Sequence, residues 1–261
     1  MEGLQMDPTS TKMPSSCNKM SEPEPRPNRR RRRRRRPASP SPDSSADGAQ
    51  SEHQEKSEEQ TRLMGPTKAE TALLPAFEGV SLDQIYVPIT QAECRDAVDE
   101  IRAAGIGGFD TEAKPTFRKG QKCNGPHVVQ FALTDKAYIF QLHRSECENA
   151  ASELIASKEV LKVGFGLKND HGQIWNRLQI PLNHVLDLDQ TFRKMGYRGQ
   201  IGVRGAMGVL LKLCFKKSKS TTTSNWSLPE LTPRQLTYAA NDAFAALKIM
   251  EALQAEGHIE K

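Results

Sequence analysis

From residue 106 onward, short apolar runs alternate with helix-like segments, and this order restricts the chain to a small group of folds. The runs at residues 106–112, 128–133 and 137–142 come first, and Thr134, Asp135 and Lys136 join the last two in a turn typical of a hairpin. Later runs, at residues 160–165 and 184–188, alternate with helical sequence. This pattern predicts an α/β domain with a mixed β-sheet flanked by helices.

Two of the expected helices carry clear start signals. The segment TQAE at residues 90–93 has the form of a capping box, before an amphipathic stretch that glycines stop from Gly105. TPRQ at residues 232–235 supplies a cap and a first-turn proline for the clearest helix of the chain. Residues 84–89 indicate a strand, but Pro88 confines it to a sheet edge or a strand end. Further helices are expected at about residues 146–157 and from about residue 168.

The N-terminal part of the chain has a different composition. Residues 1–72 are rich in Ser, Pro, Glu, Gln and Arg and poor in the apolar residues that would offset the entropy of ordering them, so we expect a long disordered arm. Apolar runs and nearly all aromatic residues lie in residues 73–261, which we expect to form one domain.

Eight consecutive arginines, residues 29–36, dominate the charge of this arm. Such a run binds phosphates without sequence preference and is similar to a nuclear-import signal if the source has a nucleus. Two alternatives are a low-complexity tail with no selected partner and an arm that folds back on the acidic residues 52–59.

Several classes of protein are not expected. No apolar run has the length of a membrane span, and the first residues lack the apolar region of a secretory signal, so we expect a soluble protein of a bacterial cytoplasm or, in a eukaryote, of the nucleus. Five cysteines are scattered singly, with no CxxC pair, which argues against a disulfide framework or a structural zinc site.

Acidic residues from three separate segments carry the functional prediction. Asp110 and Glu112 are two apart on an expected strand and therefore share a face. Asp170 follows the strand at residues 160–165, and Tyr238 and Asp242 lie one turn apart on the last helix. Each feature alone is more often structural or solvated. Together they would bring carboxylates to one pocket, which predicts a metal-dependent nuclease.

The motifs, taken in order, resemble those of the DEDDy 3'-5' exonucleases, the ribonuclease D and Werner-type group of the RNase H-like superfamily. The resemblance covers about residues 73–253, and Tyr238 in place of His places the chain in the tyrosine branch. It implies an RNase H-like mixed sheet. The segments that carry it are FDTE (109–112), PTFRKG (115–120), PHVVQFAL (126–133) leading to AYIFQL (137–142), VLKVGFGLKND (160–170), SNWS (224–227), LTPRQ (231–235) and YAANDA (238–243).

This resemblance implies a role for each site residue. Two Mg²⁺ or Mn²⁺ ions would be bound by the four acids Asp110, Glu112, Asp170 and Asp242. Tyr238 would orient the attacking water or help to remove its proton. The implied activity is hydrolysis from the 3' end of RNA or DNA, with release of nucleoside 5'-monophosphates and little sequence preference.

Other residues are candidates for holding a nucleic-acid strand. Basic side chains would contact phosphates, and aromatic rings would stack on bases. Alternatively, Trp226 packs beneath the last helix and the lysines are merely solvated. The candidates are Thr111, which would face away from the two acids beside it, Phe117, Arg118, Lys119 and Trp226, together with the basic tract Lys212, Lys216, Lys217 and Lys219.

Two rival functions remain at this stage. One is a non-catalytic nucleic-acid-binding protein that uses the arginine run as its main contact, and the other is an interaction scaffold that works through the Pro/Ser-rich arm. The chain has no helicase motif, no HRDC-like helical domain and no Walker A loop, so we do not expect it to unwind nucleic acid.

Overall fold

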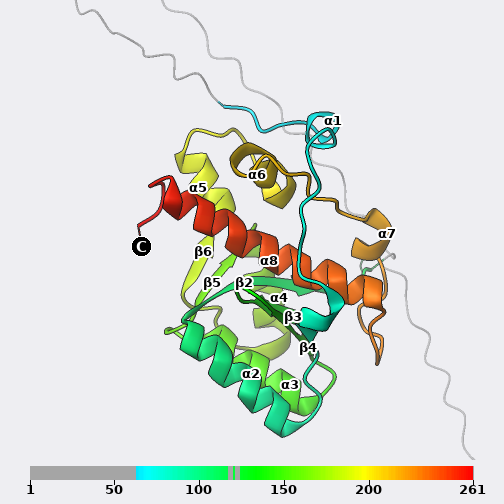
Figure 1. Ribbon diagram of the computed structural model, residues 1–261. Coiled ribbons are helices and arrows are strands. Elements are labelled where there is room, and N and C mark those ends of the chain that lie inside the picture. Colours follow the sequence, from blue (N-terminus) through cyan, green and yellow to red (C-terminus); the bar gives the residue numbers. More distant parts are fainter. Residues whose placement is uncertain (1–62, 117–119, 121–123, 261) are drawn as a thin grey trace, which may run out of the picture. The chain divides into compact units, whose positions relative to one another are not determined.

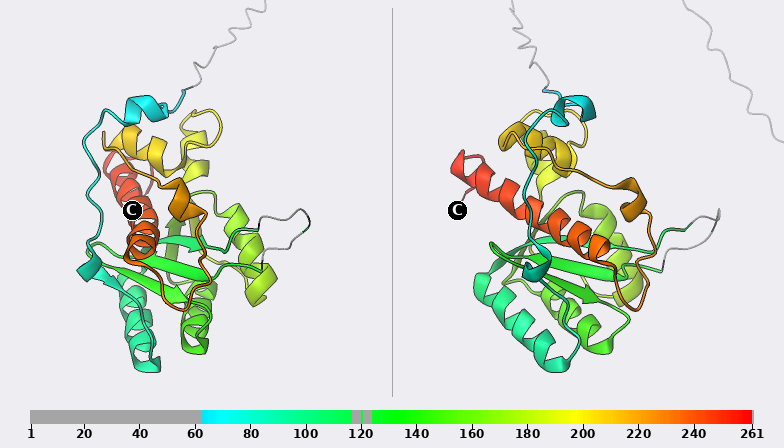
Figure 2. Two further views of the ribbon diagram at one scale, coloured as in Figure 1. Left: turned by 90° about the vertical axis from the view of Figure 1, so that its right-hand side faces the viewer. Right: turned by 45° about the vertical axis from the view of Figure 1, so that its right-hand side comes forward.

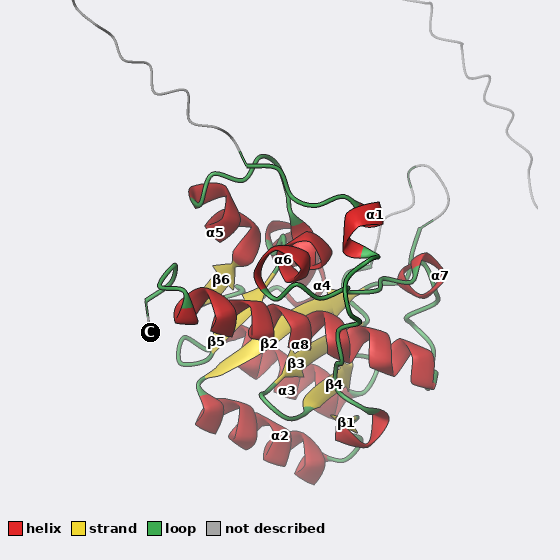
Figure 3. Cartoon of the chain, turned by 45° about the horizontal axis from the view of Figure 1, so that its top comes forward, coloured by secondary structure: helices red, strands yellow, loops and turns green. Residues whose placement is uncertain are grey.

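The computed structural model describes residues 63–116, 120 and 124–260. Within them, six strands form one sheet in the order β1-β4-β3-β2-β5-β6. Figure 1 shows the arrangement of the elements, and Figure 3 labels the edge strand β1 as well. The strands β2, β3 and β4 are joined in antiparallel fashion, and the other pairings are parallel, which confirms the mixed sheet. The strands are β1 (Ile85–Tyr86), β2 (Ile106–Glu112), β3 (Val128–Ala132), β4 (Ala137–Gln141), β5 (Leu161–Gly164) and β6 (Val185–Asp187).

Helices cover both faces of this sheet (Figures 1, 2 and 3). Apolar side chains of α2, α3 and α4 pack on one face, while α8 crosses the other together with α5 and α6. None of the described helices combines the length and apolar character needed to cross a membrane. The helices are α1 (Lys68–Thr71), α2 (Gln91–Ala104), α3 (Ser145–Ala156), α4 (Lys168–Leu178), α5 (Leu188–Lys194), α6 (Gly202–Leu210), α7 (Lys219–Thr222) and α8 (Pro233–Ala255).

The predicted start signals lie at the helix ends. Thr90 and Glu93 form a reciprocal capping box at the start of α2, and Gly105 ends that helix with a φ of 66°, in the left-handed region that glycine tolerates best. Thr232 and Gln235 form a second capping box at the start of α8, which runs for 23 residues. Local sequence therefore fixes where both helices begin.

A glycine lets α8 lie very close to the central strand. A Cβ atom at Gly108 would lie only 1.9 Å from the carbonyl oxygen of Ala243, so no larger residue fits this position without a shift of the helix. Alanines of α8, among them Ala239 and Ala240, are fully buried over the same part of the sheet. This close approach brings the residue before Ala243, Asp242, down to β2.

The ordered domain begins earlier than the sequence indicates. Residues 63–72 were predicted to belong to the disordered arm, yet Leu63 forms a bridge to Tyr197, and Thr67 caps the short helix α1, in which Thr71 is buried. These tertiary contacts order a segment whose composition alone favours disorder. The rest of the predicted arm, including the arginine run, lies outside the described residues.

The structure also bears on the predicted edge strand and on the cysteines. The strand predicted at residues 84–89 shortens to Ile85–Tyr86 at the sheet edge, because a 3₁₀ turn (Leu82–Gln84) precedes it and Pro88 has no amide to donate. The cysteines that the structure describes, Cys94, Cys147 and Cys214, are all buried.

Candidate active site

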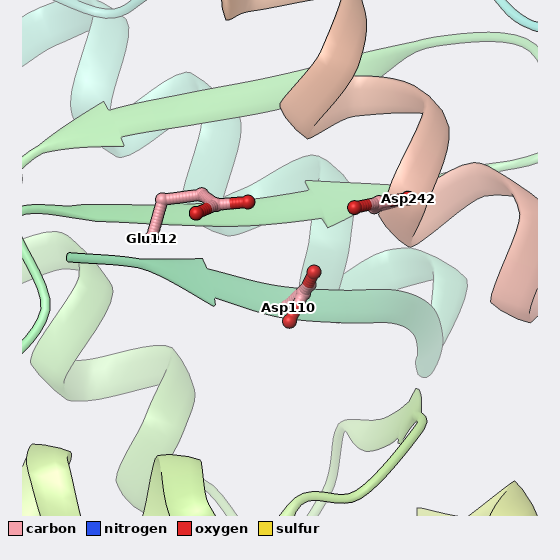
Figure 4. A group of neighbouring side chains, drawn as sticks. All are labelled: Asp110, Glu112 and Asp242. Carbon is pink, nitrogen blue, oxygen red and sulfur yellow. The ribbon is translucent and has the colours of Figure 1, made fainter. Parts of the chain in front are cut away.

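Three carboxylates converge between β2 and α8. Asp110 and Glu112 project from the same face of β2, and Asp242 reaches them from the facing helix (Figure 4). Carboxylate oxygens of these three residues all lie within 4.8 Å of one another. The predicted sharing of a face by Asp110 and Glu112 therefore holds, and the closeness of α8 at Gly108 completes the cluster.

The fourth acid, Asp170, lies in the first turn of α4 and lines a cavity together with two of the other acids. This cavity has a volume of about 450 Å³, and Asp110, Asp170 and Asp242 all line it. Asp170 is buried, and its Oδ1 accepts a hydrogen bond of 2.5 Å from Thr111 Oγ1. Thr111 contacts an acid of the site, because its side chain leaves β2 on the side where α4 begins. Its predicted contact with nucleic acid stays a prediction.

Burial and mutual repulsion disfavour the ionised form of these carboxylates and raise their pKa values. Burial raises the pKa of Asp110 well above its usual range, and the charges of Asp170 and Asp242 raise it further. Burial, and then the charge of Asp110, raises the pKa of Glu112 to about 10. Burial also raises the pKa values of Asp170 and Asp242. A buried group of acids remains charged at neutral pH only with compensating positive charge nearby.

One lysine supplies part of that compensation. Lys217 Nζ lies 2.9 Å from Asp242 Oδ2 and 5.8 Å from the centre of the Tyr238 ring. Burial alone would lower the pKa of Lys217, but the charges of Asp242 and Asp110 outweigh it and raise that pKa. One ammonium group cannot compensate four ionised carboxylates, so the fully ionised form of the cluster requires further positive charge.

Tyr238 stands one helical turn before Asp242 and is half-buried beside it. Its hydroxyl exchanges a hydrogen bond of 2.8 Å with Thr222 Oγ1, at the end of α7. Burial, followed by the charge of Asp242, raises the pKa of the Tyr238 phenol. The phenol is therefore a neutral hydrogen-bonding group at physiological pH, held at the border of the acidic cluster.

Trp226 packs beneath the last helix. Its side chain is 1% exposed, its Nε1 donates to the carbonyl oxygen of Thr222 at 3.3 Å, and its ring centre lies 6.0 Å from that of Tyr238. A covered ring leaves no face for a base to stack on. The structure thus gives Trp226 the alternative, packing role, in which it supports Tyr238 and the loop before α8.

The remaining predicted contacts do not form one patch. Phe117, Arg118 and Lys119 lie outside the described residues. Within the basic tract, Lys212 donates to the carbonyl oxygen of Val209, and only Lys217 joins the acids. Lys216 lines a different cavity, of about 410 Å³, and Lys219 begins α7 in an exposed position. The tract thus separates into side chains with different environments.

The chemistry of this donor set fits divalent metal ions. Hard cations such as Mg²⁺ and Mn²⁺ prefer carboxylate oxygens, and the cluster offers several of them at close range. Both side-chain oxygens of Asp242 are buried without a hydrogen-bond partner among the described residues, apart from the ion pair with Lys217. Buried acceptors without donors, and acids whose ionised form lacks compensating positive charge, both favour cation binding.

Some contacts of the site escaped prediction from sequence. Lys217 was expected at most to bind phosphate, and the bonds from Thr111 to Asp170 and from Thr222 to Tyr238 were not anticipated. Each joins residues that are far apart in the chain or whose side-chain direction depends on a loop. The one local signal was the position of Thr111 between Asp110 and Glu112 on a strand, which places a hydroxyl group beside the acids.

Comparison with known sequences agrees with these motifs. Residues 86–258 match the sequence profile of a family described as 3'-5' exonuclease. The chain is 29% identical over 151 residues to the bifunctional 3'-5' exonuclease/ATP-dependent helicase WRN of Mus musculus, and 28% identical over 150 residues to a 3'-5' exonuclease of Arabidopsis thaliana. These alignments cover 57% and 56% of this chain, but only 11% of the mouse protein and 52% of the plant protein.

Solved structures share the fold. The EXO domain of Nibbler from Aedes aegypti superposes with a TM-score of 0.59 at 20% identity, covering 70% of this chain and 94% of that domain. RNase D of Trypanosoma brucei in complex with RNA gives a TM-score of 0.57 at 18% identity, covering 71% of this chain and 64% of the other. The RNase H-like exonuclease fold implied by the sequence motifs is thereby confirmed.

Proposed function

Because the chain belongs to the 3'-5' exonuclease family, we propose that it hydrolyses phosphodiester bonds from the 3' end of RNA or DNA with two divalent metal ions, Mg²⁺ or Mn²⁺, and releases nucleoside 5'-monophosphates. The observation that carries this proposal is the cluster of half-buried Asp110 with buried Glu112 and Asp242, in which carboxylate oxygens of the three acids lie within 4.8 Å of one another. Asp170, across the same cavity, is the fourth proposed ligand.

Each proposed role follows from the position of the side chain. Asp110, Glu112 and Asp242 would hold the cations, with Asp170 oriented by its bond from Thr111. When bound, such cations lower the pKa of water and stabilise charge on the attacking and leaving oxygens. Tyr238, neutral and already hydrogen-bonded through its hydroxyl, would orient the attacking water. Lys217, already beside Asp242, would provide positive charge near the phosphate.

The arginine run adds a second, separable part to the proposal. Residues 29–36 would raise the general affinity for nucleic acid through phosphate contacts, without base recognition. Deleting these eight residues should weaken binding at low salt and flatten the dependence of affinity on salt concentration. Hydrolysis at saturating substrate should change little, because the arm would not take part in the chemical step.

The test is a nuclease assay on the full chain. Single-stranded RNA, single-stranded DNA and a recessed duplex end are incubated with Mg²⁺ or Mn²⁺, beside Asp110→Asn and Asp242→Asn variants. Asp99→Asn, an exposed acid on α2, is the matched control. We expect the wild type and the control to release mononucleotides only from substrates with an accessible 3' end, and the two site variants to release none.

Two results would reject the assignment. Release of mononucleotides that survives both site substitutions would place the active site elsewhere. Nucleic-acid binding without degradation under either metal, lost on deletion of residues 29–36, would instead identify a non-catalytic binding protein on the same fold. The substrate panel also decides between RNA and DNA, since discrimination depends on how the 2'-hydroxyl is met.

A further inference from the structure

A glutamine in the middle of the sheet is buried, and its side chain makes no hydrogen bond to any residue that the structure describes. Gln130, on β3, is 0% exposed, and neither its Nε2 nor its Oε1 has a partner among the described residues. Leaving a buried amide without a hydrogen-bond partner destabilises a folded protein. Gln141 on β4 shows the ordinary arrangement, since its Nε2 donates to the carbonyl oxygen of Leu228 at 3.1 Å. Among the described residues, Gln130 thus lacks the hydrogen bonds that a buried amide normally makes.

The sheet register places Gln130 beside the acidic cluster. It stands opposite Asp110 in the antiparallel pair of β2 and β3, and both side chains leave the sheet on the face covered by α8. Directly opposed residues in such a pair have Cβ atoms about 4.5–5.5 Å apart. The neighbours of Gln130 along β3 on this face, and its partner on β4, are apolar: Val128, Ala132 and Ile139. Asp110 is thus the polar side chain directly opposite it, while Glu112 and Gln141 lie diagonally from it on the same face.

One carboxylate oxygen of Asp110 accepts a hydrogen bond, and the other has no hydrogen-bond donor among the described residues. Its Oδ1 accepts a hydrogen bond of 2.9 Å from the Thr111 amide. A second donor on the other oxygen would fix the plane of the carboxylate. An amide suits this place better than a lysine would, because it supports a carboxylate without adding a positive charge that competes with cations.

We propose that Gln130 is a positioning residue for the acidic cluster, whose Nε2 donates to the Asp110 carboxylate and whose Oε1 accepts from a water molecule when the cluster holds divalent cations. This inference rests on the proposed function, since it gives the buried amide its partners only in the metal-loaded protein. It explains why an unpaired amide is retained at a position where an apolar residue of the same size would stabilise the fold.

The test compares Gln130→Met with wild type and with Gln141→Met, using the full chain. Met matches Gln in size but cannot donate or accept in the same way. In chelator, we expect Gln130→Met to melt at a higher temperature than wild type, whereas Gln141→Met, which loses a satisfied bond, should melt at a lower one. In calorimetric titrations with Mn²⁺, Gln130→Met should bind 10- to 100-fold more weakly, the range typical for loss of a group that orients a metal ligand. Gln141→Met should bind Mn²⁺ like the wild type.

A second variant guards against an uninformative folding defect. Gln130→Asn keeps the amide but shortens its reach by one methylene group, so it should also lose Mn²⁺ affinity. Wild-type Mn²⁺ affinity in either Gln130 variant, or a lower melting temperature of Gln130→Met in chelator, would overturn the role of Gln130 while leaving the proposed nuclease intact. A wild-type chain that neither binds Mn²⁺ nor degrades nucleic acid would overturn the proposed function, and the role of Gln130 with it.

Discussion

Replacing Glu112 with Gln should stabilise the metal-free protein while strongly reducing its activity. The substitution keeps the shape of a side chain that is 8% exposed and removes its ionisable group from a cluster where oxygens of three acids lie within 4.8 Å. Loss of one proposed metal ligand should remove several kcal/mol of transition-state stabilisation, or about 10²- to 10³-fold in rate. Stability should change in the opposite direction, for an electrostatic reason.

The sign of that change follows from the pKa of Glu112. Burial, together with the charges of Asp110 and Asp242, raises this pKa to about 10, from the usual value of 4.5 that the unfolded chain would show. Between these two values the folded protein holds a proton that the unfolded chain has released. Stability in the absence of metal is therefore greatest at low pH and falls as the pH rises through this window. The amide of the variant does not titrate, so the advantage of Glu112→Gln grows with pH.

One proton difference corresponds to about 1.4 kcal/mol per pH unit, so from pH 6 to pH 8 the advantage should grow by at most about 3 kcal/mol. Proton binding by Glu112 is coupled to proton binding by Asp110 and Asp242, so removing Glu112 removes only part of the pH dependence. The expected increase in the free energy of unfolding is therefore about 1–3 kcal/mol. For a domain of this size, that is a rise in melting temperature of about 3–10 °C. The measurement is thermal unfolding in chelator at pH 6, 7 and 8, with the exposed Glu159→Gln as control.

A Glu112→Gln variant that is no more stable than wild type at pH 8, or whose advantage is the same at all three pH values, would refute this reasoning. Adding Mn²⁺ provides a second check. The wild type should gain stability with Mn²⁺ and lose its sensitivity to pH, because bound cations compensate the carboxylates, whereas the variant should gain much less.

Three further substitutions test the construction of the site. Gly108→Ala forces a Cβ atom to 1.9 Å from an α8 carbonyl oxygen and should cost about 1–3 kcal/mol in chemical denaturation, with activity lost as the helix shifts; Gly172→Ala, which meets no atom within 4 Å, should be neutral or stabilising. Lys217→Met removes the cation beside the buried acids and should lower the melting temperature in chelator more than in saturating Mn²⁺; an equal loss in both would disprove its compensating role. Thr111→Val removes the bond to Asp170, so Mn²⁺ affinity measured by titration should fall about tenfold, and unchanged affinity would contradict the contact.

Local rules predicted a large part of this fold. The capping boxes at Thr90 and Thr232, the hairpin around Asp135 and the shared face of Asp110 and Glu112 each depend on residues a few positions apart. For such features, sequence spacing fixes which groups meet. The order of strands and helices then restricts the sheet to a few topologies, one of which the chain adopts.

Features that depend on tertiary packing were not predictable in the same way. Nothing in the sequence around Lys217 distinguishes it from the other lysines of its tract, because its ion pair depends on where the loop before α7 crosses α8. The burial of Trp226 likewise depends on how that loop folds under the helix. From sequence alone, Gly108 is only a strand residue of low β-propensity. The distance of 1.9 Å from a Cβ atom built on it to the Ala243 carbonyl oxygen shows why no side chain fits there.

Residues 79–80, which precede the family match at residues 86–258, also support the YAANDA motif of α8. The Val80 amide donates to Asn241 Oδ1 at 2.9 Å, beside Asp242, and a Cβ atom on Gly79 would lie 1.8 Å from the oxygen of that same side chain. A chain shortened to residue 86 would keep all four acids yet lose this brace. The structural unit thus starts upstream of residues 86–258, the stretch that matches the family profile, and any engineered version has to carry those earlier residues along.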